Sequence, residues 1–175
     1  MDFILAQILG IIALIFVSIG YFLKNKESFL KFQIVSNFFY AAAFFVIGSY
    51  VGAFIVMISN FSCLYLYFSE KKSFKYKLHF LPIFVIAYAI ITIVFWKNTF
   101  DFIPLITSIM FTFGLTIKNL QSMRYFLIIP NALLVVYNIL TSTYASALLD
   151  FIEIVVIICA IVKFYKNGNK AIINE

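Results

Sequence analysis

Residues 3–23 are FILAQILGIIALIFVSIGYFL, a run without a charged side chain. The hydrocarbon core of a bilayer is about 30 Å thick, and a helix of roughly 20 apolar residues crosses it. The run therefore predicts a membrane-spanning helix. Asp2 is the one charged residue before it, and lysines follow it. Secretory signals have the positive charge first and a shorter apolar core, so we expect this helix to be retained.

The rest of the chain has the same character. Of its 175 residues, 65% are hydrophobic and 11% are charged, with a mean hydropathy of +1.08. Soluble domains carry about 25% charged residues. This composition therefore excludes a soluble globule, a disordered chain and a secreted disulfide scaffold. The net charge of +6 comes from basic clusters between apolar runs, which indicates membrane topology and not nucleic-acid binding.

Six further apolar segments follow the first, separated by short polar or basic breaks. We expect all seven to be transmembrane helices of an all-α membrane protein. The seven segments are residues 3–23, 30–48, 51–69, 78–96, 101–117, 122–141 and 144–165.

The basic residues predict how these helices are oriented. Seven crossings place alternate breaks on opposite sides, which puts twelve of the thirteen Lys and Arg residues on one side and only Lys97 on the other. Positive residues stay cytoplasmic. We therefore expect the N-terminus outside and the C-terminus in the cytoplasm.

An internal repeat is visible when the chain is shifted by 94 residues against itself. Over residues 12–72, thirteen of 61 aligned positions are identical. The informative pairs are Gly20/Gly114, Lys24/Lys118, Asn25/Asn119, Ser28/Ser122, Asn37/Asn131 and Tyr50/Tyr144. We predict two parallel three-helix repeats at residues 1–72 and 98–166. A cytoplasmic loop and connector helix (73–97) joins them, and a cytoplasmic tail (167–175) follows. The alternative is a chance alignment of similar apolar helices.

Short motifs in both halves carry a family likeness. They are Leu5-Ala6-Gln7…Gly10…Ala13, Phe32-Gln33 and Phe45…Gly48…Tyr50 in the first half, and Pro104, Asn119, Arg124, Tyr137-Asn138, Tyr144 and Glu153 in the second. On these residues the chain resembles the YgjV family of bacterial inner-membrane proteins over nearly its whole length, which implies a bacterial cytoplasmic (inner) membrane location. The 3-1-3 helix plan also resembles that of SWEET and PQ-loop transporters. This chain departs from them in having no Pro-Gln dipeptide and only three prolines.

Two carboxyl groups lie inside the last predicted helix. Glu153 is near its middle and Asp150 precedes it by three positions, so both project from one face. Because no Lys or Arg lies at similar depth, these carboxyls either face a wet cavity or are protonated. We predict a site for a cation, an amine or a proton. The alternative is a protonated carboxyl that only joins neighbouring helices.

Other polar side chains inside the predicted helices extend this candidate substrate site. They are Asn37, Asn60, Asn131, Tyr137 and Asn138. Amides at depth either contact a polar solute or hold helices together by hydrogen bonds. Pro130 lies mid-helix and removes a backbone donor, so we expect a kink there, either a hinge for transport or a static bend.

These features predict a carrier or facilitator for a small polar or cationic solute, working by alternating access between the two three-helix bundles in the lipid bilayer. The alternative is a non-transport membrane protein: a sensor, an assembly factor or a packing partner. The chain has no Ser-His pair, metal-ligand spacing or phosphate-binding Gly-rich loop, so we expect no enzyme activity, metal or cofactor. The solute and the oligomeric state stay open.

Overall fold

The computed structural model describes residues 2–71, 80–96, 99–141 and 143–173. Within these ranges the chain forms seven α-helices and a single-turn 3-10 helix (Thr99–Asp101). The helices are α1 (Asp2–Tyr21), α2 (Lys26–Val46), α3 (Tyr50–Lys71), α4 (Leu81–Val94), α5 (Phe102–Thr116), α6 (Leu120–Leu140) and α7 (Tyr144–Ile173). The prediction of an all-helical chain is confirmed.

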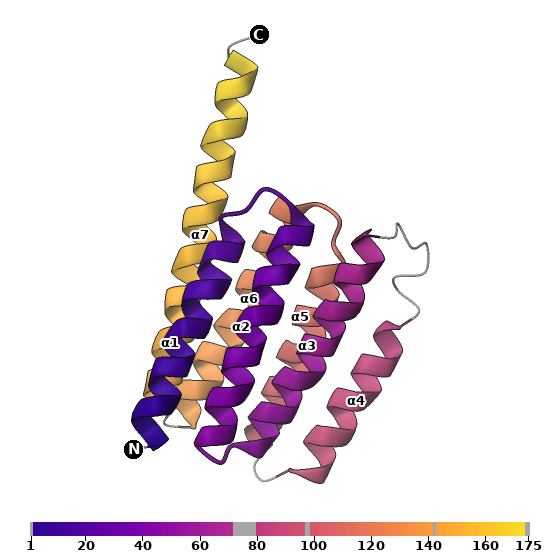
Figure 1. The fold of residues 1–175 in the computed structure, drawn as a ribbon, viewed down its shortest axis with the longest axis vertical. Coiled ribbons are helices and arrows are strands. Elements are labelled where there is room, and N and C mark those ends of the chain that lie inside the picture. Colours follow the sequence, from indigo (N-terminus) through magenta and orange to yellow (C-terminus); the bar gives the residue numbers. More distant parts are fainter. Residues whose placement is uncertain (1, 72–79, 97–98, 142, 174–175) are drawn as a thin grey trace.

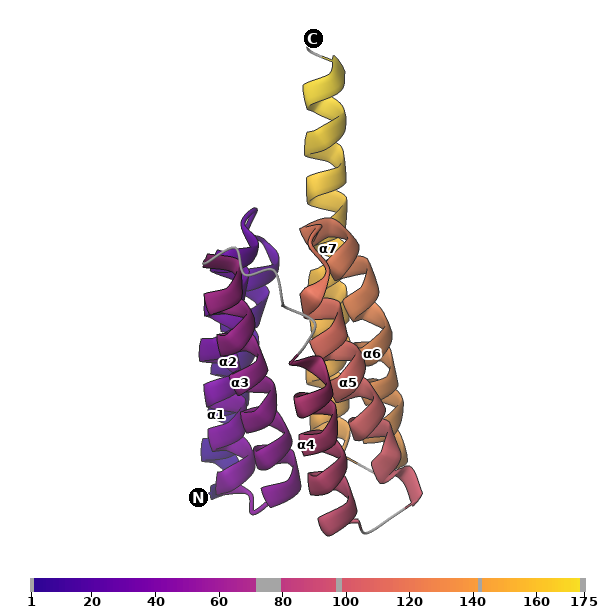
Figure 2. The ribbon, with the colours of Figure 1, turned by 90° about the vertical axis from the view of Figure 1, so that its right-hand side faces the viewer.

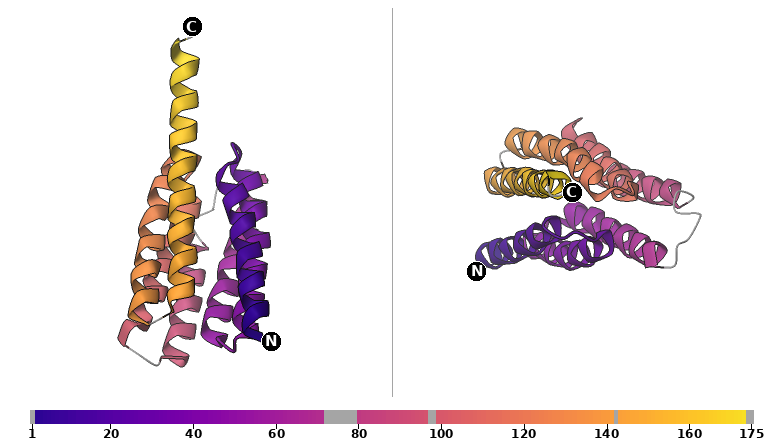
Figure 3. Two further views of the ribbon diagram at one scale, coloured as in Figure 1. Left: turned by 90° about the vertical axis from the view of Figure 1, so that its left-hand side faces the viewer. Right: turned by 90° about the horizontal axis from the view of Figure 1, so that it is seen from above.

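The helices run along one axis with alternating direction, and the C-terminal part of α7 extends beyond the others (Figure 1). Figures 2 and 3 show two layers, with α1, α2 and α3 in one and α5, α6 and α7 in the other. In each layer the middle helix packs against both of its neighbours. The connector α4 packs against α3 and α5 at one edge, and α1 contacts α7 between the layers.

Among the described residues, four helices are long and apolar enough to cross a membrane by length and composition. The candidate spans are Ile4–Tyr21, Lys26–Val46, Tyr50–Glu70 and Leu120–Leu140. The helices α4 and α5 are apolar but shorter than the predicted 78–96 and 101–117. At about 1.5 Å per residue, the 14 residues of α4 extend only ~21 Å. The lysine-rich stretch at 72–77 and Lys97 lie outside the described residues.

The helices α2 and α6 start with the same cap. The side-chain oxygen of Asn25 accepts a hydrogen bond from the backbone N–H of Glu27 at 2.9 Å, and that of Asn119 from Gln121 at 2.8 Å. An asparagine cap pairs an N–H that has no partner inside the helix. For this reason both helices start before their apolar runs, earlier than predicted. The first residue of α6 lies 94 positions after the first residue of α2, and the last residues of the two helices have the same separation.

The same offset relates the two sides of the buried core. Both layers contribute to one cluster of buried apolar side chains. It contains the pairs Tyr21/Leu115, Phe29/Met123, Cys63/Ile157 and Leu66/Ala160, each 94 positions apart. Eight of the twelve residues of this cluster thus form pairs separated by 94 positions.

Glycines let α1 approach α2 and α5 approach α6 closely. A Cβ atom added at Gly114 would lie 2.8 Å from Phe126 Cδ1 and 2.9 Å from Leu127 Cδ2. A Cβ atom added at Gly20 would lie 3.3 Å from Phe32 Cβ, the contact 94 positions earlier. At both places a larger residue would push the second helix away.

Gly114→Ala should therefore destabilise the protein relative to Gly10→Ala. At Gly10 an added Cβ atom meets only Leu149 Cδ1 at 3.5 Å, an ordinary contact. Both changes share the helix-propensity gain of about 1 kcal/mol. Their difference therefore isolates the overpacking, for which we expect about 1–3 kcal/mol. Melting temperatures in one detergent measure this difference, and equal values for the two variants would contradict it.

Candidate functional site

Glu153 of α7 lies where helices from both layers meet. Its side chain is buried, with an exposed fraction of 7%. Its Oε1 atom accepts a hydrogen bond from the hydroxyl of Tyr21 in α1 at 2.8 Å and one from Asn131 Nδ2 in α6 at 3.4 Å. Tyr21 and Asn131 are themselves buried. The three side chains thus form one network that joins α1 to α6 and α7.

The stretches of α1, α6 and α7 that carry this network contain no basic residue. Residues 2–21 and 125–162 include no Lys, Arg or His. The hydroxyl of Tyr40 in α2 lies close enough to Glu153 and Asp150 to interact with both electrostatically. The donors held against Glu153 are therefore neutral. A buried carboxyl group without a cationic partner depends on such donors, because a lost hydrogen bond cannot be replaced by water.

A second amide–carboxyl pair joins α6 and α7 nearer to the turn between them. Asn138 Nδ2 donates to Asp150 Oδ2 at 2.6 Å, and Asn138 Oδ1 accepts from the Thr143 hydroxyl at 2.9 Å. Tyr137 is half-buried beside Asn138 in α6. The two helices are thus linked twice, through Asn131 and Glu153 and through Asn138 and Asp150. This brings together four residues of the predicted site.

The two asparagines in the first layer have other surroundings. Asn37 accepts a hydrogen bond from Gln33 Nε2 at 3.1 Å and donates to Cys63 Sγ at 3.7 Å. Asn60 in α3 is half-buried, and its Oδ1 atom has no hydrogen-bond partner among the described residues. Within the same part of the chain, no hydrogen bond connects either asparagine to Glu153.

The helix α6 continues through the buried Pro130, from Leu120 to Leu140. A hinge at this position therefore stays a prediction. In the described ranges, no group of three or more His, Cys, Asp or Glu side chains is placed to hold a metal ion.

Tyr21 and Tyr40 were not among the predicted site residues. Sequence offered one signal for Tyr21, because the 94-residue offset aligns it with Leu115. A tyrosine in place of a leucine at corresponding positions indicates that one half needs a hydroxyl group there. The same offset aligns Tyr40 with Leu134, so the same signal was present there, in a run rich in aromatic and small residues.

A family model named Imp-YgjV, described as bacterial inner membrane protein, matches residues 4–168. No curated protein and no solved structure matches the chain. The matched range includes every residue of the Tyr21, Asn131 and Glu153 network.

Tyr21→Phe should destabilise the protein because it removes the cross-layer donor to Glu153. Leaving a buried polar atom unpaired costs about 1–3 kcal/mol. Melting temperatures in detergent test this, with Tyr144→Phe as the control, since Tyr144 is exposed at the start of α7.

The coupling between the two residues sharpens this test. In the Glu153→Gln background, Tyr21→Phe should cost less than it does in the wild type, because the two groups no longer form the same bond. A Tyr21→Phe variant as stable as Tyr144→Phe would show that this hydrogen bond contributes nothing.

Proposed function

The chain belongs to the Imp-YgjV family of bacterial inner membrane proteins, and on this premise we propose that it carries a small polar or cationic solute across that membrane. The proposed mechanism is alternating access between the layer of α1, α2 and α3 and the layer of α5, α6 and α7. The proposal is for transport and not catalysis. The observation that carries it is the buried Glu153 carboxyl, which accepts one donor from each layer.

The two hydrogen bonds on Glu153 respond differently to a separation of the layers. Asn131 is in the same layer as Glu153 and moves with it, whereas Tyr21 belongs to the opposite layer. Separation therefore removes the Tyr21 donor. A carboxyl group at membrane depth then needs a replacement. An N–H or O–H group of a solute supplies it, so the favoured ligands are amines, ammonium groups and other hydrogen-bond donors.

The Asn138 and Asp150 pair extends the site toward the turn between α6 and α7. Its amide and carboxyl groups repeat the chemistry of Asn131 and Glu153 closer to one end of the bundle. A solute that enters from that end meets the outer pair first and the inner pair second. The two pairs thus provide successive polar positions along one helix interface.

Two parallel three-helix repeats, as in a SWEET-like plan, are the proposed moving parts. Three observations support residues 1–72 and 98–166 as corresponding units. The bounds of α2 and α6 match at the 94-residue offset, both helices have an asparagine cap, and Gly20 and Gly114 make matching contacts. Residues 73–97 then serve as the connector, and Pro130 as a hinge. In transporters with parallel repeats, the substrate site lies near the midplane at the repeat interface.

The proposed orientation has the N-terminus outside and the C-terminus in the cytoplasm. The distribution of Lys and Arg supports it, because twelve of thirteen fall on the side of the C-terminus. We call this side of the bundle the basic end. Among the described residues it includes the turn from Leu23 to Lys26 and the turn from Ile117 to Asn119.

A second candidate is a membrane protein that carries nothing and uses these polar side chains to hold its helices together. The mutual hydrogen bonds of Tyr21, Asn131 and Glu153 favour it, since the three groups already pair with each other. Interhelical hydrogen bonds of this kind contribute about 0.6–2 kcal/mol. The two candidates differ in whether a solute can replace the Tyr21 donor.

A thermal-stability screen of the purified protein against polar solutes, amines included, tests the carrier. A ligand at a hundred times its Kd stabilises a protein by about 2.7 kcal/mol. We expect at least one solute to raise the melting temperature of the wild type and of Glu27→Gln, but not of Glu153→Gln. Glu27 is the matched control because its carboxyl pairs with Lys31 at 3.3 Å, away from the network.

Uptake of that solute into proteoliposomes should show the same dependence on Glu153. The opposite result is a screen with no stabilising solute and a Glu153→Gln variant as stable as the wild type or more so. That result would contradict the proposed carrier and favour the second candidate, a protein that uses these side chains only to hold its helices together.

A further inference from the structure

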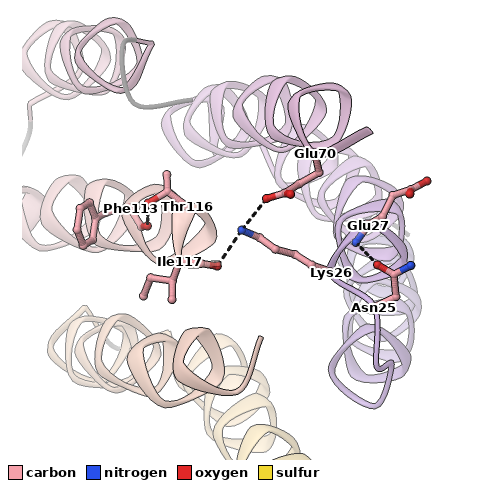
Figure 4. Close-up of polar contacts among 7 residues, drawn as sticks. All are labelled: Asn25, Lys26, Glu27, Glu70, Phe113, Thr116 and Ile117. Atoms are coloured by element: carbon pink, nitrogen blue, oxygen red, sulfur yellow. Dashed lines mark hydrogen bonds and ion pairs between the residues drawn. The ribbon is translucent and has the colours of Figure 1, made fainter. Parts of the chain in front are cut away.

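Two cationic side chains cross between the layers at the basic end. Lys26 of α2 donates from Nζ to the backbone oxygen of Ile117 at 2.8 Å, across the gap between the ribbons of α2 and α5 (Figure 4). In the opposite direction, Arg124 of α6 donates from one guanidinium nitrogen to the backbone oxygen of Leu23 at 2.6 Å. Each layer therefore donates one hydrogen bond from a cationic side chain to a backbone oxygen of the other layer.

The two backbone acceptors are corresponding atoms of the two halves. Leu23 and Ile117 are 94 positions apart, and each lies just beyond a helix, α1 or α5. Their backbone N–H groups make the same contact, to Gly20 and Gly114, at 3.1 Å in both cases. Carbonyl oxygens at a helix C-terminus have no intrahelical donor and carry the negative end of the helix dipole. Both acceptors thus favour a cation.

Both cations are held in place by further partners. The Lys26 side chain is 9% exposed and pairs with Glu70 at 3.0 Å. Arg124 is 2% exposed, donates to Gln121 Oε1 at 2.7 Å and stacks 4.3 Å from the Phe164 ring. Long cationic side chains are seldom buried unless they are paired. Lys26 and Arg124 meet this condition through partners in both layers.

The contact at Leu23 is connected to the network of Glu153 by the last turn of α1. Tyr21 precedes Leu23 by two residues, and its hydroxyl donates to Glu153 at 2.8 Å. When Arg124 holds Leu23, the same short segment presents Tyr21 to the carboxyl group. Release of Leu23 frees this segment to move away from α7.

We propose that Lys26 and Arg124 form a latch that closes the space between the two layers at the basic end, with Leu23 and Ile117 as its paired acceptors. The proposal rests on the proposed alternating access. In the closed state Tyr21 satisfies Glu153. Opening separates Lys26 from Ile117 and Arg124 from Leu23, withdraws Tyr21 and exposes Glu153 to the basic side.

The buried Cys63 serves as a reporter of this opening. It belongs to the core shared by the two layers and is fully buried, whereas the other cysteine, Cys159, is exposed. In a Cys159→Ser background, a charged, membrane-impermeant methanethiosulfonate reagent reports access from water to Cys63. Sealed membrane vesicles of either orientation present the reagent to one end of the bundle at a time.

In this background Lys26→Met should speed modification of Cys63 about tenfold when the reagent is on the basic side, which corresponds to one lost charge-assisted hydrogen bond. Lys31→Met is the matched control. The contacts of Lys31 stay within the first layer, with Glu27 of α2 at 3.3 Å and the Tyr67 ring of α3 at 5.5 Å, so its removal should leave the rate unchanged. Lys26→Arg keeps the charge and should restore most of the slow rate.

Two results would overturn the latch. One is an unchanged rate in Lys26→Met. The other is an equal acceleration from both sides, which would indicate general loosening of the bundle. The assay needs no solute, so it separates this proposal from the carrier. If Cys63 modification is faster from the basic side only and no solute is transported, the latch is supported and the carrier is contradicted. If a solute binds but the rate of Cys63 modification is unchanged, the carrier is supported and the latch is contradicted.

Discussion

The hydrocarbon core of a bilayer offers no water to a polar group, so Glu153 must find its hydrogen-bond donors within the protein. Its partners come from α1 and α6, and the carboxyl itself is on α7. This requirement fixes how the first layer sits against the second. Apolar packing around it has no fixed direction, whereas these two hydrogen bonds require a hydroxyl from α1 and an amide from α6 at the same carboxyl oxygen.

Several features of the two layers recur at the 94-residue offset, but the polar site does not. The offset relates the bounds of α2 and α6, their caps, two glycine contacts and four pairs of core positions. At the site it pairs unlike residues: Glu153 with Ser59, Tyr21 with Leu115, and Asp150 with Val56. On the side of α4 and α5, the Tyr88 and Thr112 hydroxyls lie 3.0 Å apart. Among the described residues, the paired carboxyls are therefore on one side only, where α1 contacts α7 and α6 supplies Asn131 and Asn138.

Much of the fold could be predicted because apolar length is a direct physical signal in a membrane protein. All seven predicted segments contain a helix, and the errors are at the ends. Asn25 starts α2 before the apolar run, since a cap depends on one polar side chain and not on hydropathy. The last helix, α7, continues past its predicted end at residue 165 to Ile173, because a helix does not need an apolar sequence once it leaves the bilayer.

The site was predictable only in part. Glu153 and Asp150 stood out because carboxyl groups are costly in an apolar helix, and the structure pairs them with the predicted Asn131 and Asn138. Tyr21 did not stand out, since a tyrosine at a helix end is typical of the membrane interface. Helical periodicity shows which residues share a face. It does not show how neighbouring helices are rotated, and that rotation brings Tyr21 to Glu153.

In the proposed mechanism the two layers separate and close around Glu153. A distance measurement between spin labels at Lys31 in α2 and Tyr125 in α6 tests it most directly, because both side chains are exposed and lie in opposite layers. With both native cysteines replaced by serine, we expect two populations of the distance between the labels in lipid. Tyr21→Phe should increase the share of the population with the longer distance. A single narrow distribution that Tyr21→Phe leaves unchanged would contradict it.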